Sequence, residues 1–209
     1  MFEQWKSDVA AVMSRDPAVH SALEVMLCYP GYRAIRRHRR AHRAYMHGHF
    51  LLARLISSRT QRLTGIDIHP GATIGQGLFI DHGFGVVIGE TAVIGNGVTL
   101  YQGVTLGGTG KDTGKRHPTL GDYVTVGAGA KVLGPITIGD HVKVGAGSIV
   151  LKDVPKDCTV VGNPGRIVRR SAPAPQVDLN QTDLPDPVLE SISTLAERMD
   201  KLEGKSEET

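Results

Sequence analysis

The chain has 209 residues, a formal net charge of +3 and few aromatic residues (5%). This length suits one domain with a helical annex, and so small a charge gives no argument for a nucleic-acid partner. No apolar run is long enough to span a membrane and the N-terminus lacks a signal-peptide pattern, so we expect neither membrane insertion nor export. Two cysteines without CxxC spacing indicate a reducing compartment, and the cytoplasm is the expected location.

Residues 1–65 are predicted to form an α-helical N-terminal domain. A first helix should end near residue 14, because apolar residues recur in it at three-to-four spacing. A second helix is expected to start at Asp16-Pro17, with Asp as N-cap and Pro in the first turn. After the break at Tyr29-Pro30-Gly31, a third helical stretch should run from about Tyr32 to Ser58.

The beginning of this third stretch is basic. Its cationic and imidazole side chains are Arg33, Arg36, Arg37, His38, Arg39, Arg40, His42 and Arg43. No aromatic platform or recognition motif accompanies them, so a solvated helix face, or one that pairs with acidic residues of a neighbouring subunit, is favoured over a nucleic-acid or membrane surface. The histidines lack acidic or cysteine partners at ligand spacing, so no metal site is predicted.

From Ile68 to Val154 an aliphatic residue recurs every six positions. The series is Ile68, Ile74 and Ile80, then Ile88, Ile94, Leu100 and Leu106, then Leu120, Val126, Val132, Ile138, Val144 and Val150. A helix repeats near 3.6 residues and a strand at 2, so neither explains this period. A six-residue repeat is typical of a parallel β-helix, in which three hexads close one triangular coil. About thirteen hexads predict four to five coils over residues 66–170, with a β-sandwich of short strands as the alternative.

Two irregularities interrupt the repeat. Between Ile80 and Ile88 eight residues replace six, which should push part of one coil outward and expose His82. Between Gly107 and Thr119 eight extra residues should leave the coil as a glycine-rich loop. Insertions in solenoids cluster on the functional face, so we expect the chemistry at these two places.

The last part, residues 171–209, is predicted to be a linker followed by a helix. The linker is rich in Pro and Asp, and Asp186-Pro187 is a helix start signal. Leu189, Ile192, Leu195, Met199 and Leu202 then fall at helical spacing. This stripe either packs on another subunit or belongs to a marginal helix.

An Asp–His pair is the first candidate for catalysis. Asp67 lies fifteen residues before His82, close to the length of one coil, so the two side chains should be near each other. An Asp bonded to one imidazole nitrogen leaves the other nitrogen able to take a proton from a hydroxyl. The alternative is that Asp67 caps the junction and His82 is an ordinary surface residue.

Arg116-His117 at the base of the loop is the second candidate. An arginine fork binds a carboxylate with two hydrogen bonds, so the loop is suited to hold a small acid. The alternative is that these charges only aid solubility. GGTGK lacks the spacing and the strand-to-helix setting of a phosphate-binding loop, so nucleotide hydrolysis is excluded.

These motifs together resemble the serine O-acetyltransferase family of hexapeptide-repeat acyltransferases. The motifs are RDPA, CYPG, DIHPGATIG, DHGFGVVIGETAVIG, VTLGGTGK with RHP, GAGAKVLGPITIG and VGNPGRIV, and they cover residues 10 to 170. The resemblance implies a mainly β chain with an α annex, built on a left-handed parallel β-helix. It also implies acetyl transfer from acetyl-CoA to the hydroxyl of L-serine, giving O-acetyl-L-serine for cysteine biosynthesis, and a homotrimer, with a hexamer as the alternative.

The resemblance also implies roles for particular residues. His82 matches the general base and Asp67 its acidic partner, and no metal takes part. Asp81, Arg116 and His117 match residues that hold serine. The acetyl-CoA groove between subunits is expected to be lined by Gly107, Gly108, Thr109, Lys111, Ala128, Ala130, Lys131 and Ala146, with Arg166 near the CoA phosphates.

The sequence departs from the family pattern in ways that affect the site and the partners. The resemblance implies an acidic residue that touches serine from the helical region where this chain has His20. Glu24, one turn later, is the candidate substitute, and the alternative is that this contact is absent. The family's sulfhydrylase-docking tail ends in Ile, whereas this chain ends in Thr209, so a complex with that enzyme is not expected. The alternative functions are acyl transfer to a sugar or homoserine, a β-helix scaffold without activity, and a metal enzyme resembling γ-carbonic anhydrase.

Overall fold

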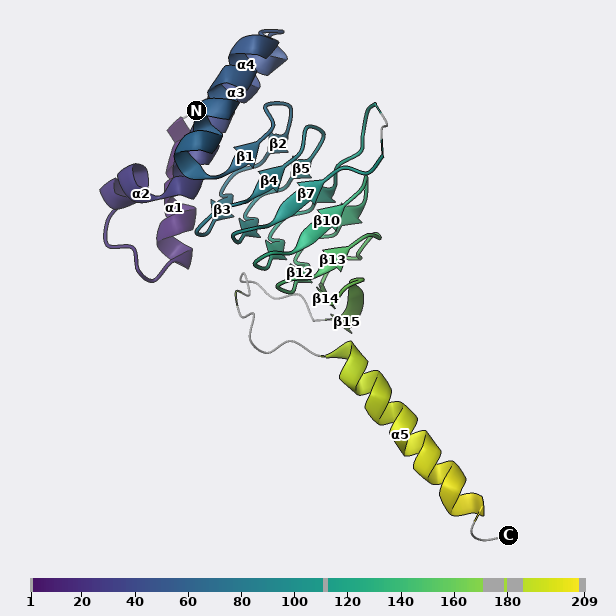
Figure 1. The fold of residues 1–209 in the computed structure, drawn as a ribbon. Helices are drawn as coiled ribbons and strands as arrows, with labels where there is room; N and C mark the ends of the chain where they lie inside the picture. Colours follow the sequence, from purple (N-terminus) through teal and green to yellow (C-terminus); the bar gives the residue numbers. More distant parts are fainter. Residues whose placement is uncertain (1, 111–112, 171–178, 180–185, 207–209) are drawn as a thin grey trace.

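The computed structural model describes residues 2–110, 113–170, 179 and 186–206. A helical layer sits at one end of a triangular prism of stacked β-coils, and a single long helix follows the other end (Figure 1). The helical layer consists of α1 (Phe2–Arg15), α2 (Ala22–Cys28), α3 (Pro30–Met46) and α4 (Phe50–Thr64).

The helical layer differs from the predicted one at two points. The second helix does not start at Asp16-Pro17; its N-cap is Ser21, whose hydroxyl accepts the N–H of Glu24. Asp16 instead accepts the N–H of Ala18 in a turn, because a short side-chain oxygen caps a turn as readily as a helix. The stretch expected from Tyr32 to Ser58 is two helices, since the chain reverses at Gly48, whose φ of 78° suits glycine.

The prism has three parallel faces, which we call A, B and C. Face A holds β1 (Asp67–Ile68), β4 (Val87–Ile88), β7 (Thr105–Gly107), β10 (Lys131–Leu133) and β13 (Ile149–Val150). Face B holds β2 (Thr73–Ile74), β5 (Val93–Ile94), β8 (Thr119–Leu120) and β11 (Thr137–Ile138). Face C holds β3 (Phe79–Ile80), β6 (Thr99–Leu100), β9 (Thr125–Val126), β12 (Lys143–Val144), β14 (Cys158–Val161) and β15 (Arg166–Arg170).

The six-residue period is confirmed by this arrangement. Successive strands β1 to β13 pass through faces A, B and C in turn, so the chain circles the prism once every three hexads. The periodic aliphatic side chains point inward and form one continuous buried core with Ala34 and Ile35 of α3. The core therefore grows coil by coil, as in other solenoids, and the helical layer closes its first end.

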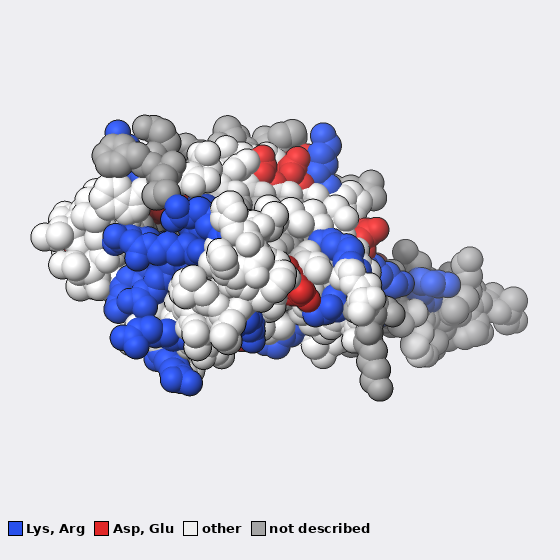
Figure 2. All heavy atoms as spheres, turned by 90° about the horizontal axis from the view of Figure 1, so that it is seen from above, with Lys and Arg blue, Asp and Glu red and all other residues white. Residues whose placement is uncertain are grey.

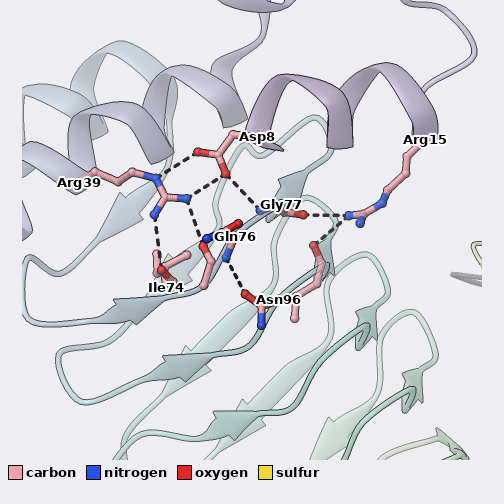
Figure 3. A network of polar contacts seen from close by, with 9 residues as sticks. Asp8, Arg15, Arg39, Ile74, Gln76, Gly77 and Asn96 are labelled. Atoms are coloured by element: carbon pink, nitrogen blue, oxygen red, sulfur yellow. Dashed lines mark hydrogen bonds and ion pairs between the residues drawn. The ribbon is translucent and has the colours of Figure 1, made fainter. Parts of the chain in front are cut away.

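A polar network fixes the helical layer on the first coils (Figure 3). The carboxylate of Asp8 in α1 accepts two hydrogen bonds from the guanidinium of Arg39 in α3, at 2.8 and 3.0 Å. Asp8 also accepts the N–H of Gly77, while Arg39 donates to the carbonyl of Gly75. Arg15 at the end of α1 donates to the carbonyls of Gly77 and Val98. Backbone groups at a prism corner are thus satisfied by side chains of two helices.

The basic segment of α3 lies on the outside of the helical layer. Figure 2 looks down on this end and shows Lys and Arg side chains gathered on one side of it. The exposed arginines of α3 and α4 are Arg36, Arg40, Arg43, Arg54, Arg59 and Arg62. His38, by contrast, is buried where α3 packs on the prism.

Candidate active site

The eight-residue irregularity forms a bulge at the edge where face C leads to face A, which we call the C–A edge (residues 81–86 in this coil). His82 adopts a φ of 55°, and Gly83 and Gly85 adopt φ values of 79° and 75°. The His82 side chain is 76% exposed, and its Nε2 lies 4.0 Å from Asp81 Oδ1. The prediction that the irregularity would place His82 outside the core is confirmed.

The bulge packs against the segment that opens the prism. Gly85 donates its N–H to the carbonyl of Gly65, and Asp67 donates its N–H to the carbonyl of Val86. Within the described residues no hydrogen bond or ion pair joins the side chains of Asp67 and His82, although the fold holds their segments together. Their functional pairing stays a prediction.

Tyr29 brings the helical layer to this edge, which the sequence did not predict. Its hydroxyl donates to Asp16 Oδ2 at 2.7 Å. This hydrogen bond, with burial and the negative charges of Asp16, Glu24 and Asp81, raises the pKa of Tyr29 to about 12. Tyr29 and Asp16 therefore form a hydrogen-bonded pair in the helical layer, and the phenol is near enough to the bulge to be influenced by the charge of Asp81.

Glu24, the proposed serine contact, has a structural partner. Its Oε2 accepts the N–H of His20 at 2.9 Å, while its own N–H bonds the hydroxyl of Ser21. The two bonds cap the start of α2. Glu24 lies close enough to act on Tyr29, so its role toward serine stays a prediction, with Asp16 as a second acidic candidate.

We call the edge where face A leads to face B the A–B edge. Arg116 is held there, on the opposite side of face A from the C–A edge. Its Nη2 pairs with Glu90 Oε2 at 2.7 Å. The other oxygen of Glu90 accepts the hydroxyl of Tyr45 in α3 at 3.1 Å. Glu90 and Tyr45 were not predicted from the sequence. Glu90 could have been found, because it is the only acidic residue between Asp81 and Asp112.

His117 is locked in one tautomer by Thr91. The Thr91 N–H donates to His117 Nδ1 at 3.2 Å, so Nδ1 is unprotonated and Nε2 carries the hydrogen of the neutral ring. Burial, with the nearby charge of Arg116, lowers the pKa of His117. His117 is therefore a neutral N–H donor at physiological pH, and its Nε2 faces Gly89 and Gly108.

The residues expected to line the acetyl-CoA groove fall into several places. Ala128 and Ala146 lie below the bulge on the C–A edge, where Gly103 bonds the carbonyl of Phe84 and Gly147 that of Ala128. Lys131 Nζ donates to the carbonyl of Gly103 on the same edge.

Ala130, directly before β10, lies on the same C–A edge, but its methyl group is buried in the core, so only its backbone can face a ligand. The other groove residues lie elsewhere. Gly107, Gly108 and Thr109 belong to the loop at the A–B edge, Arg166 is exposed in β15, and Lys111 lies outside the described residues.

The two groups of candidate residues are separated within one chain. His82, Asp81, Ala128 and Ala146 lie on the C–A edge, whereas Arg116, His117 and the glycine-rich loop lie on the A–B edge. A face about five residues wide spans roughly 15 Å at about 3.3 Å per residue. A small amino acid does not bridge that distance, so one chain does not bring these residues into a single site.

A metal site and a membrane-spanning helix are two further possibilities. In residues 2–110, 113–170, 179 and 186–206, no group of three or more His, Cys, Asp or Glu side chains is arranged to hold a metal ion. No helix of the described part of the chain combines the length and apolar character needed to cross a membrane.

Family profiles match three parts of the chain. "Serine acetyltransferase, N-terminal" matches residues 1–37, and "Bacterial transferase hexapeptide (six repeats)" matches residues 117–152. "Hexapeptide repeat of succinyl-transferase" matches residues 83–102. The helical layer and the repeats are thus recognised separately.

Known proteins match nearly the whole chain. The serine acetyltransferase of Synechococcus elongatus is 54% identical over 208 residues, covering 99% of this chain and 84% of that protein. The Neisseria gonorrhoeae enzyme solved in complex with serine is 45% identical, with a TM-score of 0.78, covering 80% of this chain and 69% of that one. The Brucella abortus enzyme solved with coenzyme A is 45% identical, with a TM-score of 0.80, covering 82% and 68%. These similarities confirm the predicted left-handed parallel β-helix.

Proposed function

The chain belongs to the serine acetyltransferase family, whose members transfer acetyl from acetyl-CoA to serine, and from this premise we propose how its residues carry out that transfer. The enzyme is an acetyl-CoA-dependent O-acyltransferase that acts on the serine hydroxyl. The cytoplasm is its proposed compartment, because Cys28 and Cys158 are free thiols. O-acetyl-L-serine is the product, and its proposed use is cysteine synthesis.

His82 is the proposed general base. Its imidazole takes the proton of the serine hydroxyl as the oxygen attacks the thioester carbonyl carbon. The C–S bond then breaks, and the protonated His82 returns the proton to the CoA sulfur. Asp67 is proposed to orient and support the imidazolium once substrate closes the site, because its segment packs against the bulge. No covalent acyl-enzyme is needed.

The residues of the A–B edge are proposed to bind the negatively charged groups of the reactants, namely the serine carboxylate and the oxyanion. Arg116 is fixed by Glu90, and a guanidinium has five N–H donors, so pairing with Glu90 is compatible with binding the serine carboxylate. The neutral His117 offers its Nε2–H beside Gly108. Backbone N–H groups of Gly107–Gly108 are the proposed donors to the oxyanion of the tetrahedral intermediate.

We propose a homotrimer because the C–A edge and the A–B edge of one chain are too far apart to form a site together. If the C–A edge of one subunit meets the A–B edge of the next, every site is completed by a neighbour. This contact is heterologous, and a three-fold rotation closes it into a ring. Phe84 beside His82 is 79% exposed, which fits an edge that another subunit covers.

A complementation experiment tests the shared site. His82→Ala and Arg116→Ala chains, carrying different affinity tags, are co-expressed and assayed by thiol release at low serine. In random trimers each mixed trimer regains one intact site of three, so activity should return to about one quarter of wild type.

If each site lies within one chain, the mixed sample will be no more active than the average of its two parents. Homoserine and sugar acceptors in the same assay test the substrate: activity with either above that with serine would contradict the assignment.

A further inference from the structure

The helix α5 (Pro187–Ser206) extends away from the prism (Figure 1). It carries a stripe of exposed apolar side chains. Val188, Leu189, Ile192, Leu195 and Met199 are 56–61% exposed, and none belongs to either buried apolar cluster of the described chain. The stability of a helix in a protein comes mostly from the packing of its apolar face. Its apolar face therefore requires a covering surface.

The spacing of the stripe indicates what covers it. Val188, Ile192, Leu195 and Met199 follow one another at intervals of four, three and four residues, and the sequence continues to Leu202 after three more. This is the heptad pattern of a coiled coil, with Ile192 and Met199 at a positions and Val188 and Leu195 at d positions. A helix packed on a globular body usually shows a broader face with a 3.6-residue period.

The charges also favour another α5 over a membrane or an acidic partner. Residues 187–206 contain three basic and four acidic side chains, so the helix carries no excess of positive charge. In this register Arg198 is at a g position and Glu203 at the following e position, which pair across two parallel helices in register. Leu189 and Ala196 at e positions widen the apolar seam, as bundles of more than two helices require.

The start of the helix is also defined. Asp186 Oδ1 accepts the N–H groups of Val188 and Leu189 at 2.9 and 3.1 Å, with Pro187 in the first turn. Every copy of α5 therefore begins at the same residue. Because α5 follows the end of the prism opposite the helical layer, copies in a ring of parallel prisms leave it at the same end.

We propose that the three α5 helices of the trimer form a parallel coiled coil that joins the subunits beyond their β-helices. The inference rests on the trimer of the proposed function. Attachment to an assembled body raises the local concentration of the helices to the millimolar range, which lets so short a coiled coil form.

Disulfide trapping tests the bundle in the full-length chain. In a Cys28→Ser background, Leu195→Cys places a thiol at a d position and Glu197→Cys, the matched control, places one at an outward f position. Under mild oxidation, Leu195→Cys should form a disulfide between two of the three chains of each trimer, so about two thirds of the chains migrate as linked dimers. The linked fraction should be several-fold smaller for Glu197→Cys. Light scattering of the same samples gives the oligomeric state.

The outcomes separate the two proposals. Trimers in which both cysteines cross-link equally, or not at all, overturn the coiled coil and leave the shared active site intact. A monomer overturns the trimer and the coiled coil together. In a second variant, Ile192→Asp should lose the helical ellipticity of α5 while acetyl transfer stays at the wild-type rate; unchanged ellipticity would also contradict the coiled coil.

Discussion

The fold gives His82 and His117 opposite environments. His82 stands exposed on a bulge, whereas His117 is buried with its Nδ1 occupied by Thr91. Only His82 is thus placed to exchange a proton with a substrate, and His117 is restricted to donating a hydrogen bond. This difference supports the proposed roles of His82 as base and His117 as hydrogen-bond donor.

Removing the base and its partner should have different effects. His82→Ala should lower turnover by about two to four decades, the usual contribution of general-base catalysis. Asp67→Asn should lower turnover more than it changes serine affinity, because it disturbs the orientation of the imidazole. Steady-state kinetics measure both, with His141→Ala on the same prism as control. Near-normal turnover of His82→Ala would rule out the base role.

Arg116→Ala should chiefly raise the KM for serine. The expected factor is about 10 to 100, which corresponds to a charged hydrogen bond of about 1.5–3 kcal/mol. Tyr45→Phe removes the hydroxyl that holds Glu90 and should give a smaller rise with little change in turnover. Arg40→Ala, on the exposed side of α3, is the control. An unchanged serine saturation curve for Arg116→Ala would refute the carboxylate assignment.

His38 should make stability depend on pH. Burial, with the positive charge of nearby side chains, lowers the pKa of His38 to about 3. In the unfolded chain this histidine has its ordinary pKa near 6.5, so below that pH it binds a proton that the folded state does not bind. The free energy of unfolding therefore falls as pH drops from about 6.5 toward 3. Urea unfolding of wild type and His38→Gln at pH 7 and 5 measures this. The variant should lose less stability on acidification; an equal loss in both proteins would contradict the prediction.

At the scale of elements, each departure from the hexad repeat has a specific outcome. The two extra residues before Ile88 create the C–A bulge, and the extra residues after Gly107 create the A–B loop. Neither disturbs the strand register, because β4 still pairs with β1 and β8 with β5. Insertions at corners are tolerated since the coils are held by the strands between them.

The Asp8–Arg39 pair should behave as a coupled unit that joins α1 to α3 where both helices meet the prism. Asp8 is 3% exposed, so Arg39→Met alone leaves a buried carboxylate without its cation and should cost about 3–5 kcal/mol. The double variant Asp8→Ala with Arg39→Met should cost clearly less than the sum of the two single variants. Urea unfolding in a double-mutant cycle measures the coupling, with Arg43→Met as an exposed control. Additive effects would show that Asp8 and Arg39 do not act as a pair between α1 and α3.

At the scale of the whole molecule, stability depends on the continuous core. Leu100→Ala in a middle coil should cost about 2–5 kcal/mol, because this fully buried side chain contacts the coils on both sides. Leu151→Ala makes the same truncation at a side chain that is 49% exposed and should cost well under 1 kcal/mol. Denaturant midpoints compare them. Similar losses would mean that the coils do not share one cooperative core.

The prediction from sequence succeeded where the physics is local and repeated. A period of six determines which side chains point inward, so the β-helix, its core residues and both interruptions were predicted correctly. The start of α5 at Asp186-Pro187 was also predicted, because a cap and a proline act within one turn. The start of α2 was wrong, since Asp16 has two local uses and sequence spacing does not choose between them.

The sequence by itself determined the fold, the family and the residue types that the reaction needs, because repeat period and motif spacing are properties of the chain. Only the tertiary structure decided which of those residues lie together. Tyr29 meets Asp16 near Asp81, and Glu90 joins Tyr45 to Arg116, through contacts between segments far apart in sequence. The structure also separates His82 from Arg116 across face A. The edge that each residue occupies depends on its position within its own coil, which the strand pairing of the fold determines.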